Sequence, residues 1–209
     1  FCYDTFEMEL EVISPVAQTP TPLVECDEVP NDGFADFDLL EDIDGDGFPD
    51  LVSEIINGQT DMTVTFHLTL PDAEAGFPEL PNIFNGTTQT IFARLQSAIP
   101  GLEDCYDTIE LDLIVNEAPE ITNPIAPYPL CDNDQNGTEV FDLITWGENE
   151  ILNGLTDVTL TYFNSPGNPI LNPDTYESPG SETVFVVAEN LEGCTTIDSF
   201  ELVIEVVDT

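Results

Sequence analysis

Internal repetition is the feature that most constrains the fold of this chain. Three cysteines each precede a segment in which polar and apolar residues alternate: Cys2, Cys105 and Cys194. Two others each open an acidic segment that ends in Phe-Asp-Leu: Cys26 and Cys131. Self-similarity at a long period is typical of tandem domains. We therefore divide the sequence into the last strand of a preceding unit and two whole units: residues 1–14, 15–117 and 118–209.

Within each unit the residue pattern is that of β-strands. Period-two alternation, which predicts strands, recurs in four segments: residues 63–70, 109–115, 159–163 and 182–189. Residues 39–58 and 143–154 fit a short helix or an irregular turn. About seven short strands per unit, separated by Gly- and Asn-rich turns, indicate an all-β fold of tandem immunoglobulin-like β-sandwich domains. The Pro-rich joints before each unit favour extended linkers.

The charge is almost entirely of one sign. Asp and Glu number 43 against a single Lys or Arg, so the formal net charge is -42. Such a chain cannot neutralise phosphates, which excludes a nucleic-acid partner. The apolar fraction of 41% favours a folded protein over a disordered one. Because folding must overcome self-repulsion, we expect bound cations, high salt or covalent cross-links to support it.

The ends and apolar runs of the sequence carry two further expectations. No apolar run approaches the ~18 residues needed to cross a bilayer, so membrane insertion is not expected. The sequence opens with Phe1 and Cys2 in the middle of the repeat pattern, which indicates that it is part of a longer chain.

The phase of the cysteines predicts their pairing. Each whole unit has one cysteine near its front and one before its last strand, which predicts Cys26–Cys105 and Cys131–Cys194. Cys2 is then left without a partner. Reduced core thiols are the alternative, and a zinc site is disfavoured because the sequence has no Cys-x-x-Cys pair. Disulfides imply an exported protein in an oxidising environment.

An acidic loop in the first unit is the sharpest chemical signal. Calcium loops place oxygen ligands at positions 1, 3, 5, 7 and 9, with Gly at position 6. Gly47 occupies position 6, and Ser53 replaces the usual bidentate Glu at position 12. The five matching ligands, one of them a backbone carbonyl, are Asp42, Asp44, Asp46, Phe48 (carbonyl) and Asp50. We expect calcium here; a solvated acidic turn is the alternative.

The loops after Cys26 and Cys131 are weaker metal candidates. In the second unit the matching positions are Asp132, Asp134, Asn136 and the carbonyl of Thr138. Val140 breaks the pattern at position 9. The first-unit loop contains looser candidates: Asp27, Asn31, Asp32 and Asp36. The alternative for both loops is Asx-turn chemistry, in which Asn and Asp side chains bond their own backbone.

Three rare side chains are interpreted structurally. His67 lies in an alternating segment without a second His, and Arg94 is expected to pair with a carboxylate near a sheet edge. Trp146 is assigned to the core, with sugar stacking as the alternative. No serine elbow, catalytic Cys/His pair or phosphate loop is present in the sequence. We therefore expect no catalytic residues and no enzymatic activity.

The order of motifs resembles a known repeat. The segments that carry the resemblance are Cys26–Asp27, Asn31–Phe34, Phe37–Leu39, Val64–His67, Asp72–Gly76, Thr90–Arg94 and Cys105–Asp107. Together they resemble a repeat of very large Bacteroidota surface proteins, including the gliding-motility adhesins exported by type IX secretion. The second unit departs from the pattern in its middle, where His and Arg have no counterpart. The resemblance implies a stalk or filament of tandem immunoglobulin-like units.

These observations predict a non-enzymatic structural segment of a long extracellular adhesin or cell-surface filament, stiffened by disulfides and calcium. The expected partners are neighbouring repeats of the same long chain, with surface glycans or other cell-surface proteins as further candidates. Two alternatives remain open: a carbohydrate-binding module of a secreted protein, and a halophile protein whose acidity serves solubility.

Overall fold

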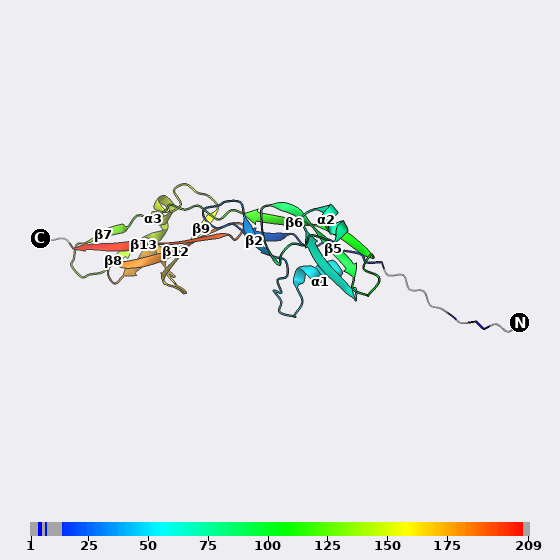
Figure 1. Ribbon diagram of the computed structural model, residues 1–209. Helices are drawn as coiled ribbons and strands as arrows, with labels where there is room; N and C mark the ends of the chain where they lie inside the picture. Colours follow the sequence, from blue (N-terminus) through cyan, green and yellow to red (C-terminus); the bar gives the residue numbers. More distant parts are fainter. Residues whose placement is uncertain (1–3, 6, 8–13, 207–209) are drawn as a thin grey trace. The chain divides into compact units, whose positions relative to one another are not determined.

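A computed structural model describes residues 4–5, 7 and 14–206 (Figure 1). Cys2 and most of the predicted strand in residues 1–14 lie outside the described residues. The chain forms two compact units. Unit 1 comprises residues 1–25 and 34–115, and unit 2 comprises residues 26–33 and 116–209. The short segment 26–33, which the repeat pattern places in the first repeat, therefore belongs to the second compact unit.

Unit 1 is a β-sandwich with two short helices. Its elements are β1 (Leu23–Cys26), β2 (Ala35–Asp38), α1 (Asp50–Ile56), β3 (Met62–His67), α2 (Leu70–Ala75), β4 (Ile83–Gly86), β5 (Gln89–Ser97) and β6 (Tyr106–Asn116). One sheet has the strand order β1-β6-β5-β3, and β2 pairs with β4 in the other. The long central pair β5–β6 is antiparallel. The two sheets supply the layers of the sandwich.

The core of unit 1 lies between these sheets and α1. Alternate residues of β5 point inward, so Ile91, Ala93 and Leu95 are fully buried. They pack with Phe37 of β2 and Ile55 of α1 in one apolar cluster. This burial explains the period-two pattern, because side chains on one face of a strand recur every second residue.

Unit 2 repeats this plan with a larger main sheet. Its elements are β7 (Tyr128–Asp132), β8 (Glu139–Phe141), α3 (Leu143–Glu150), β9 (Val158–Ser165), β10 (Asn168–Pro169), the 3-10 turn η1 (Pro173–Thr175), β11 (Tyr176–Ser178), β12 (Glu182–Asn190) and β13 (Thr195–Val206). The main sheet has the order β10-β9-β12-β13-β7, and β8 pairs with β11. The edge strand β7 runs parallel to β13.

A group of aromatic side chains packs together in the core of unit 2. Trp146 stacks on Tyr128, with ring centroids 5.0 Å apart. Its ring also lies 4.5 Å from that of Phe200. The buried Tyr162 hydroxyl donates to the Leu143 carbonyl at 2.7 Å, and burial raises the Tyr162 pKa above its ordinary value. A Cβ at Gly147 would collide with this hydroxyl, so the glycine permits the close approach of α3.

The all-β immunoglobulin-like class predicted from the sequence is confirmed by these sheets. The two segments that fitted a helix contain α1 and α3. Asp142 caps α3 by accepting a hydrogen bond from the Thr145 N–H at 3.0 Å. Residues 63–70 differ from the prediction, because β3 ends at His67 and α2 follows. Thr69 at the N-cap, Pro71 in the first turn and a left-handed Gly76 at the C-cap explain that change.

Candidate functional site

A disulfide joins Cys26 to Cys194, with an S–S distance of 2.04 Å and a sequence separation of 168 residues. The predicted pairs Cys26–Cys105 and Cys131–Cys194 are therefore wrong. Cys26 ends β1 of the first repeat, and Cys194 lies in the turn before the last strand of the second repeat. The bridge thus links the front of one repeat to the rear turn of the next.

Strand direction explains why a pair within one repeat is impossible. In unit 2, Cys131 lies beside Glu205 in the parallel β7–β13 pair, whereas Cys194 precedes the opposite end of β13. At about 3.3 Å per residue, the two cysteines lie roughly 35 Å apart along the strand. A disulfide requires Cα atoms within about 7 Å. In unit 1, the N–H of Asp27 bonds the Asn116 carbonyl at 2.8 Å, which places Cys26 at the far end of β6 from Cys105.

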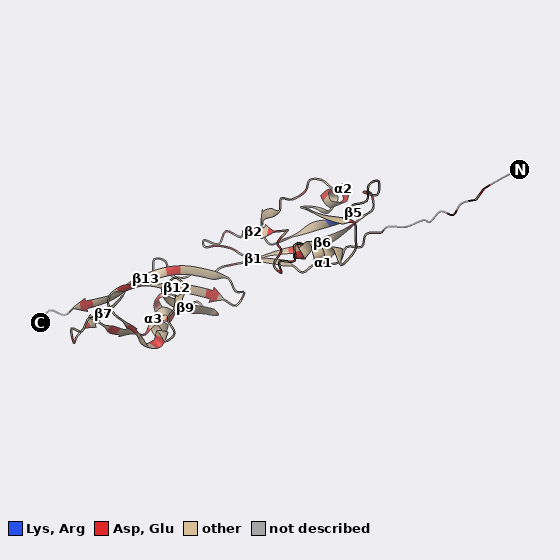
Figure 2. Ribbon diagram, turned by 90° about the horizontal axis from the view of Figure 1, so that it is seen from below, with Lys and Arg blue, Asp and Glu red and all other residues tan. Residues whose placement is uncertain are grey.

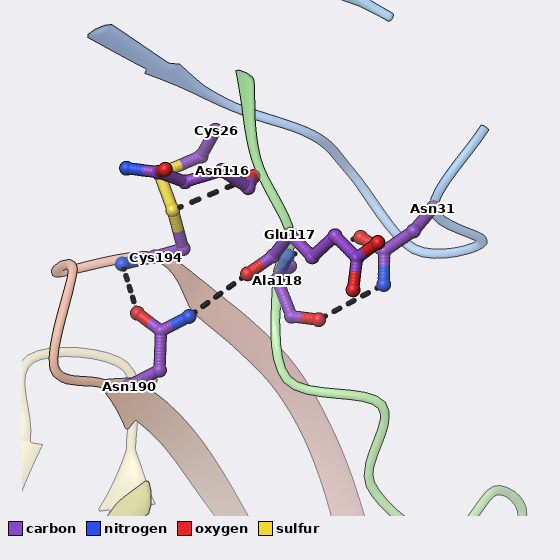
Figure 3. The surroundings of a disulfide bond; sticks show 7 residues. All are labelled: Cys26, Asn31, Asn116, Glu117, Ala118, Asn190 and Cys194. Atoms are coloured by element: carbon purple, nitrogen blue, oxygen red, sulfur yellow. Dashed lines mark hydrogen bonds between the residues drawn. A yellow bond between two sulfur atoms is a disulfide. The ribbon is translucent and has the colours of Figure 1, made fainter. Parts of the chain in front are cut away.

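The segment that follows Cys26 is held by side-chain hydrogen bonds (Figure 3). The Asn31 amide donates to the Ala118 carbonyl at 3.0 Å and accepts from the Ala118 N–H at 2.9 Å. It therefore imitates the two-way pairing of neighbouring strands. The buried carboxylate of Asp27 accepts the Gly33 N–H at 2.6 Å. Residues 26–33 thus form a folded segment that is hydrogen-bonded to Ala118, just after the end of β6. We call this segment the front hook.

The rear turn around Cys194 is equally well ordered (Figure 3). The Asn190 side chain accepts the Cys194 N–H at 2.8 Å and donates to the Glu117 carbonyl at 2.8 Å. The Cys194 Sγ lies 3.7 Å from the Asn116 carbonyl oxygen. Cys194 is fully buried. Backbone pairing, the front hook and the bridge therefore converge on residues 116–118.

Cys105 and Cys131 are free cysteines at positions equivalent to the bonded pair. Cys105 directly precedes β6, as Cys194 precedes β13. Cys131 lies near the end of β7, as Cys26 ends β1. Cys131 is exposed and Cys105 is partly exposed. Each repeat thus contributes one cysteine to the bridge and keeps the other as a free thiol. The free thiol is the rear cysteine in the first repeat and the front cysteine in the second.

The predicted calcium loop brings three carboxylates together. Oxygens of Asp42, Asp44 and Asp46 lie within 4.8 Å of one another. Calcium binds oxygens at about 2.3–2.6 Å, so ligands around one ion lie within about 5 Å of each other, and the three carboxylates fit that geometry. The fourth predicted carboxylate, Asp50, begins α1 and accepts the Ile43 N–H at 2.7 Å. Phe48 lies between them, and its side chain is exposed.

Hydrogen bonds within this loop hold the carboxylates in place. Asp42 accepts the N–H groups of Gly45 and Gly47 at 2.8 and 2.9 Å. Positive φ angles of 73° and 93° at these two glycines allow the tight turn. The backbone thus orders the carboxylates.

The loop after Cys131 uses its polar side chains internally. Asp132 is buried and accepts the N–H groups of Asn136 and Gly137 at 3.1 and 2.9 Å. The Asn136 side chain donates to Asp134 at 2.8 Å and accepts the Thr138 N–H at 2.7 Å. The set Asp132, Asp134, Asn136 and Thr138 thus makes Asx-turn bonds of the same kind as Asp42, Asp44 and Asp46 make in the first unit. The calcium prediction for this loop stays a prediction.

Arg94 and His67 stabilise unit 1 from inside. The Arg94 guanidinium donates to the Ala73 and Glu74 carbonyls, each at 2.9 Å, and lies 3.5 Å from the Tyr106 ring centroid. These described bonds go to backbone oxygens at the end of α2 rather than to the expected carboxylate. His67 is fully buried, and its Nδ1 lies 2.7 Å from the Pro78 carbonyl oxygen. Both side chains therefore have structural roles.

Acidic residues occur on strands, helices and loops of both units (Figure 2). Glu25 lies next to the bridge, and its pKa is raised mainly by burial and further by the charge of Glu41.

Within the part of the chain that the structure describes, every helix is too short or too polar to cross a bilayer.

A shallow hollow of about 520 Å³ lies beside Trp146. Its lining includes Tyr128, Asp142 and Asn149. A sugar-binding platform needs an open aromatic face, but Tyr128 and Phe200 both pack against the Trp146 ring. The Trp146 ring beside the hollow is thus packed against two other aromatic rings, which does not favour the sugar-stacking alternative.

The cysteine arrangement agrees with a comparison against protein families. The model of the Flavobacterium inter-domain disulphide bond domain matches residues 22–119 and 127–208. The chain belongs to this family. It carries two tandem copies, and the observed bridge connects a cysteine of the first copy with a cysteine of the second. A comparison with curated proteins finds no match.

Solved structures resemble the chain only distantly. Sidekick-1 immunoglobulin domains 1-5 share 14% identity over 70% of this chain and 32% of that chain, with a TM-score of 0.28. Drosophila N-cadherin EC1-4 shares 13% identity over 92% of this chain and 50% of that chain, with a TM-score of 0.26. This chain thus spans about a third of the Sidekick-1 structure. Likeness at this level adds no argument about function.

Proposed function

We propose that this chain is a non-enzymatic structural segment of a long extracellular surface protein built from tandem repeats. The bridge from Cys26 to Cys194, which ties the front of one repeat to the rear turn of the next, carries the proposal. Disulfides persist in oxidising environments outside the cytoplasm, which supports secretion or surface display. The family name links the chain to Flavobacterium and to a disulfide between domains. The sequence resemblance is what favours a Bacteroidota surface adhesin or filament exported by type IX secretion.

Surface labelling tests this proposal directly. Antibodies against the segment should label intact, unpermeabilised cells of the source organism, and deletion of a type IX secretion component should abolish the label. A label that needs permeabilisation would contradict the surface role. The carbohydrate-binding alternative predicts glycan-array binding that Trp146→Ala removes. The structural role predicts the same background signal for both proteins.

The free cysteines extend the proposal to the neighbouring repeats. Because Cys131 occupies the position of Cys26, it would bond the rear turn of a following repeat. Cys105 occupies the position of Cys194 and would bond the front of a preceding repeat. Each repeat would then be covalently tied to neighbours on both sides.

A tandem duplication tests this extension. In two consecutive copies of residues 14–206, peptide mapping without reduction should find Cys131 of the first copy bonded to Cys105 of the second. Cys26–Cys194 bridges within each copy are the internal control. Recovery of Cys105 and Cys131 as thiols at the junction would contradict the extension.

Calcium at residues 42–50 is the second stabilising element that we propose. Asp42, Asp44 and Asp46 supply a preformed group of carboxylates, and Asp50 and the Phe48 carbonyl complete the predicted ligand pattern. A cation would relieve the repulsion within this group, since two unit charges at 4 Å repel by about 4 kcal/mol at an effective dielectric of 20. Binding to the folded state alone would raise its stability.

Thermal melting measures this effect. Millimolar calcium should raise the Tm of the wild-type chain, and Asp44→Asn should remove most of the shift. Asp174→Asn, at an exposed carboxylate outside both predicted calcium loops, serves as the matched control and should retain the shift. An equal response of wild type and Asp44→Asn would contradict the assignment of the site to residues 42–50.

A further inference from the structure

In the bridged chain, the shortest covalent path between the two ends leaves out most of the main chain. A pulling force applied through the two ends of a polymer is carried by the shortest chain of bonds between them. With the bridge closed, that path leaves the main chain at Cys26 and returns at Cys194. The residues between them, a span of 168 in sequence, lie in a closed loop outside the path. Within the described residues, all three α-helices and most strands of both units belong to that loop.

We propose that the Cys26–Cys194 bridge is a tension bypass, which carries tensile force past the interiors of both repeats. This inference rests on the proposed function, because a surface filament is where such force arises. It adds a mechanical activity to the bridge. The bypass is defined here as residues 14–26, the disulfide and residues 194–206.

The segments on the bypass are already nearly extended. β1 (Leu23–Cys26) and β13 (Thr195–Val206) are strands, which rise about 3.2–3.4 Å per residue. A fully stretched chain reaches only about 3.3–3.6 Å per residue. The joint before β1 contains Pro15, Pro20 and Pro22, and proline favours extended linkers. Tension can therefore lengthen this path only slightly.

The strand on the bypass is also secured in its sheet. β13 pairs with β12 from Thr195 to Leu202 and with β7 from Leu202 to Val206. Cross-strand bonds therefore hold it along its whole length. Without the bridge, the force would instead pass through the residues between Cys26 and Cys194, which lengthen when they unfold. Unfolding of this 168-residue span would add roughly 550–600 Å of extended chain.

Single-molecule force spectroscopy on the full chain tests the bypass. A variant with Cys2→Ser, Cys105→Ser and Cys131→Ser leaves Cys26 and Cys194 as its only cysteines. Pulled by its two ends under oxidising conditions, it should show no long unfolding steps. After a thiol reductant is added to the same folded molecules, steps that total roughly 550–600 Å should appear. The further change Cys26→Ser should give those steps without reductant.

The outcomes separate the inference from the proposed function. Long steps in the oxidised variant, with the Cys26–Cys194 bond verified by peptide mapping, would overturn the bypass. An unchanged short extension after complete reduction would overturn it as well. Reducing the bridge in already folded molecules keeps the test valid even if Cys26→Ser fails to fold. The measurement involves no cell surface, so a negative labelling result and a negative extension result are independent.

Discussion

The loops that follow the two front cysteines share their chemistry and differ in what they contact. In the front hook, Asp27 caps a glycine N–H and Asn31 bonds Ala118 in both directions. In residues 131–138, Asp132 caps Gly137 in the same way, but Asn136 bonds its own loop. The first loop belongs to a unit formed largely by the following repeat. The front of the first repeat is therefore completed by residues of the following repeat.

The interiors differ in a second way. Unit 1 buries Arg94 and His67 among backbone carbonyls, whereas unit 2 stacks Tyr128, Trp146 and Phe200. Similar sandwiches thus solve the packing of their middle segments with polar bonds in one case and aromatic rings in the other. That contrast explains why the middle segments differ in sequence while the cysteine ends match.

Removal of the Cys26–Cys194 bridge should cause the largest loss of stability among these tests, and it should distinguish the two front cysteines. Cys26→Ser opens a loop of 168 residues, and the chain-entropy model gives a loss of about 5 kcal/mol in the free energy of unfolding. Cys131→Ser, the matched control, removes an exposed free thiol and should change it little. Urea unfolding without reductant measures both. Equal losses would contradict the distinction between the bonded and the free position.

The two cores should respond separately to truncation. Phe141→Ala and Phe37→Ala each remove a fully buried ring, at a cost of about 3–5 kcal/mol. Trp146 is the single tryptophan and lies in unit 2. Its fluorescence transition in urea should therefore shift to lower urea for Phe141→Ala and stay in place for Phe37→Ala. A shift of equal size in both would mean that the units unfold as one.

Loss of the buried cation should weaken unit 1 alone. Arg94→Met removes the guanidinium donor of the Ala73 and Glu74 carbonyls, of which only Ala73 keeps the Gly76 N–H, at 3.3 Å. We expect a loss of about 2 kcal/mol in the free energy of unfolding. Arg94→Lys should recover part of this loss because an ammonium can donate to the same oxygens. Far-UV circular dichroism during urea unfolding detects the change. An altered Trp146 transition would contradict its restriction to unit 1.

The Asn31 side chain of the front hook should contribute more to the free energy of unfolding than Asn136, its counterpart in residues 131–138. Asn31→Ala removes two hydrogen bonds to Ala118, which lowers the free energy of unfolding by about 1–2 kcal/mol. Asn136→Ala removes bonds within an exposed loop and should cost less. Hydrogen exchange at the Ala118 amide should accelerate in the first variant only. If Asn136→Ala accelerates that exchange equally, the two loops do not differ as described.

The smallest expected effect concerns the helix cap in unit 2. The Thr145 backbone N–H lowers the pKa of Asp142 below its ordinary value. A lowered pKa means that the carboxylate stabilises the folded state above the unfolded pKa. This contribution disappears as the pH falls through the folded pKa. Asp142→Asn retains the cap and should flatten that part of the pH dependence, as measured by Trp146 fluorescence melts between pH 5 and pH 2.

Much of the fold could be predicted because local patterns encode it. Ile91, Ala93 and Leu95 alternate in sequence and are buried in β5, so the strand pattern needed no tertiary information. The switch from β3 to α2 was missed, although Thr69, Pro71 and Gly76 were visible helix signals. They stand beside an alternating run, which dominated the prediction. The acidic group at Asp42, Asp44 and Asp46 was also recognisable from spacing, because a tight loop brings alternate residues together.

The cysteine pairing shows where local patterns end. Cys26, Cys105, Cys131 and Cys194 have the same phase whether each repeat closes on itself or bonds its neighbour. Sequence alone therefore determined the repeats, the sandwich class and the positions of the thiols. The tertiary structure decided the partners, because parallel pairing of β7 with β13 separates the two cysteines of one repeat by a full strand. The same packing brings Cys26 beside the rear turn of the next repeat, where Cys194 completes the bond.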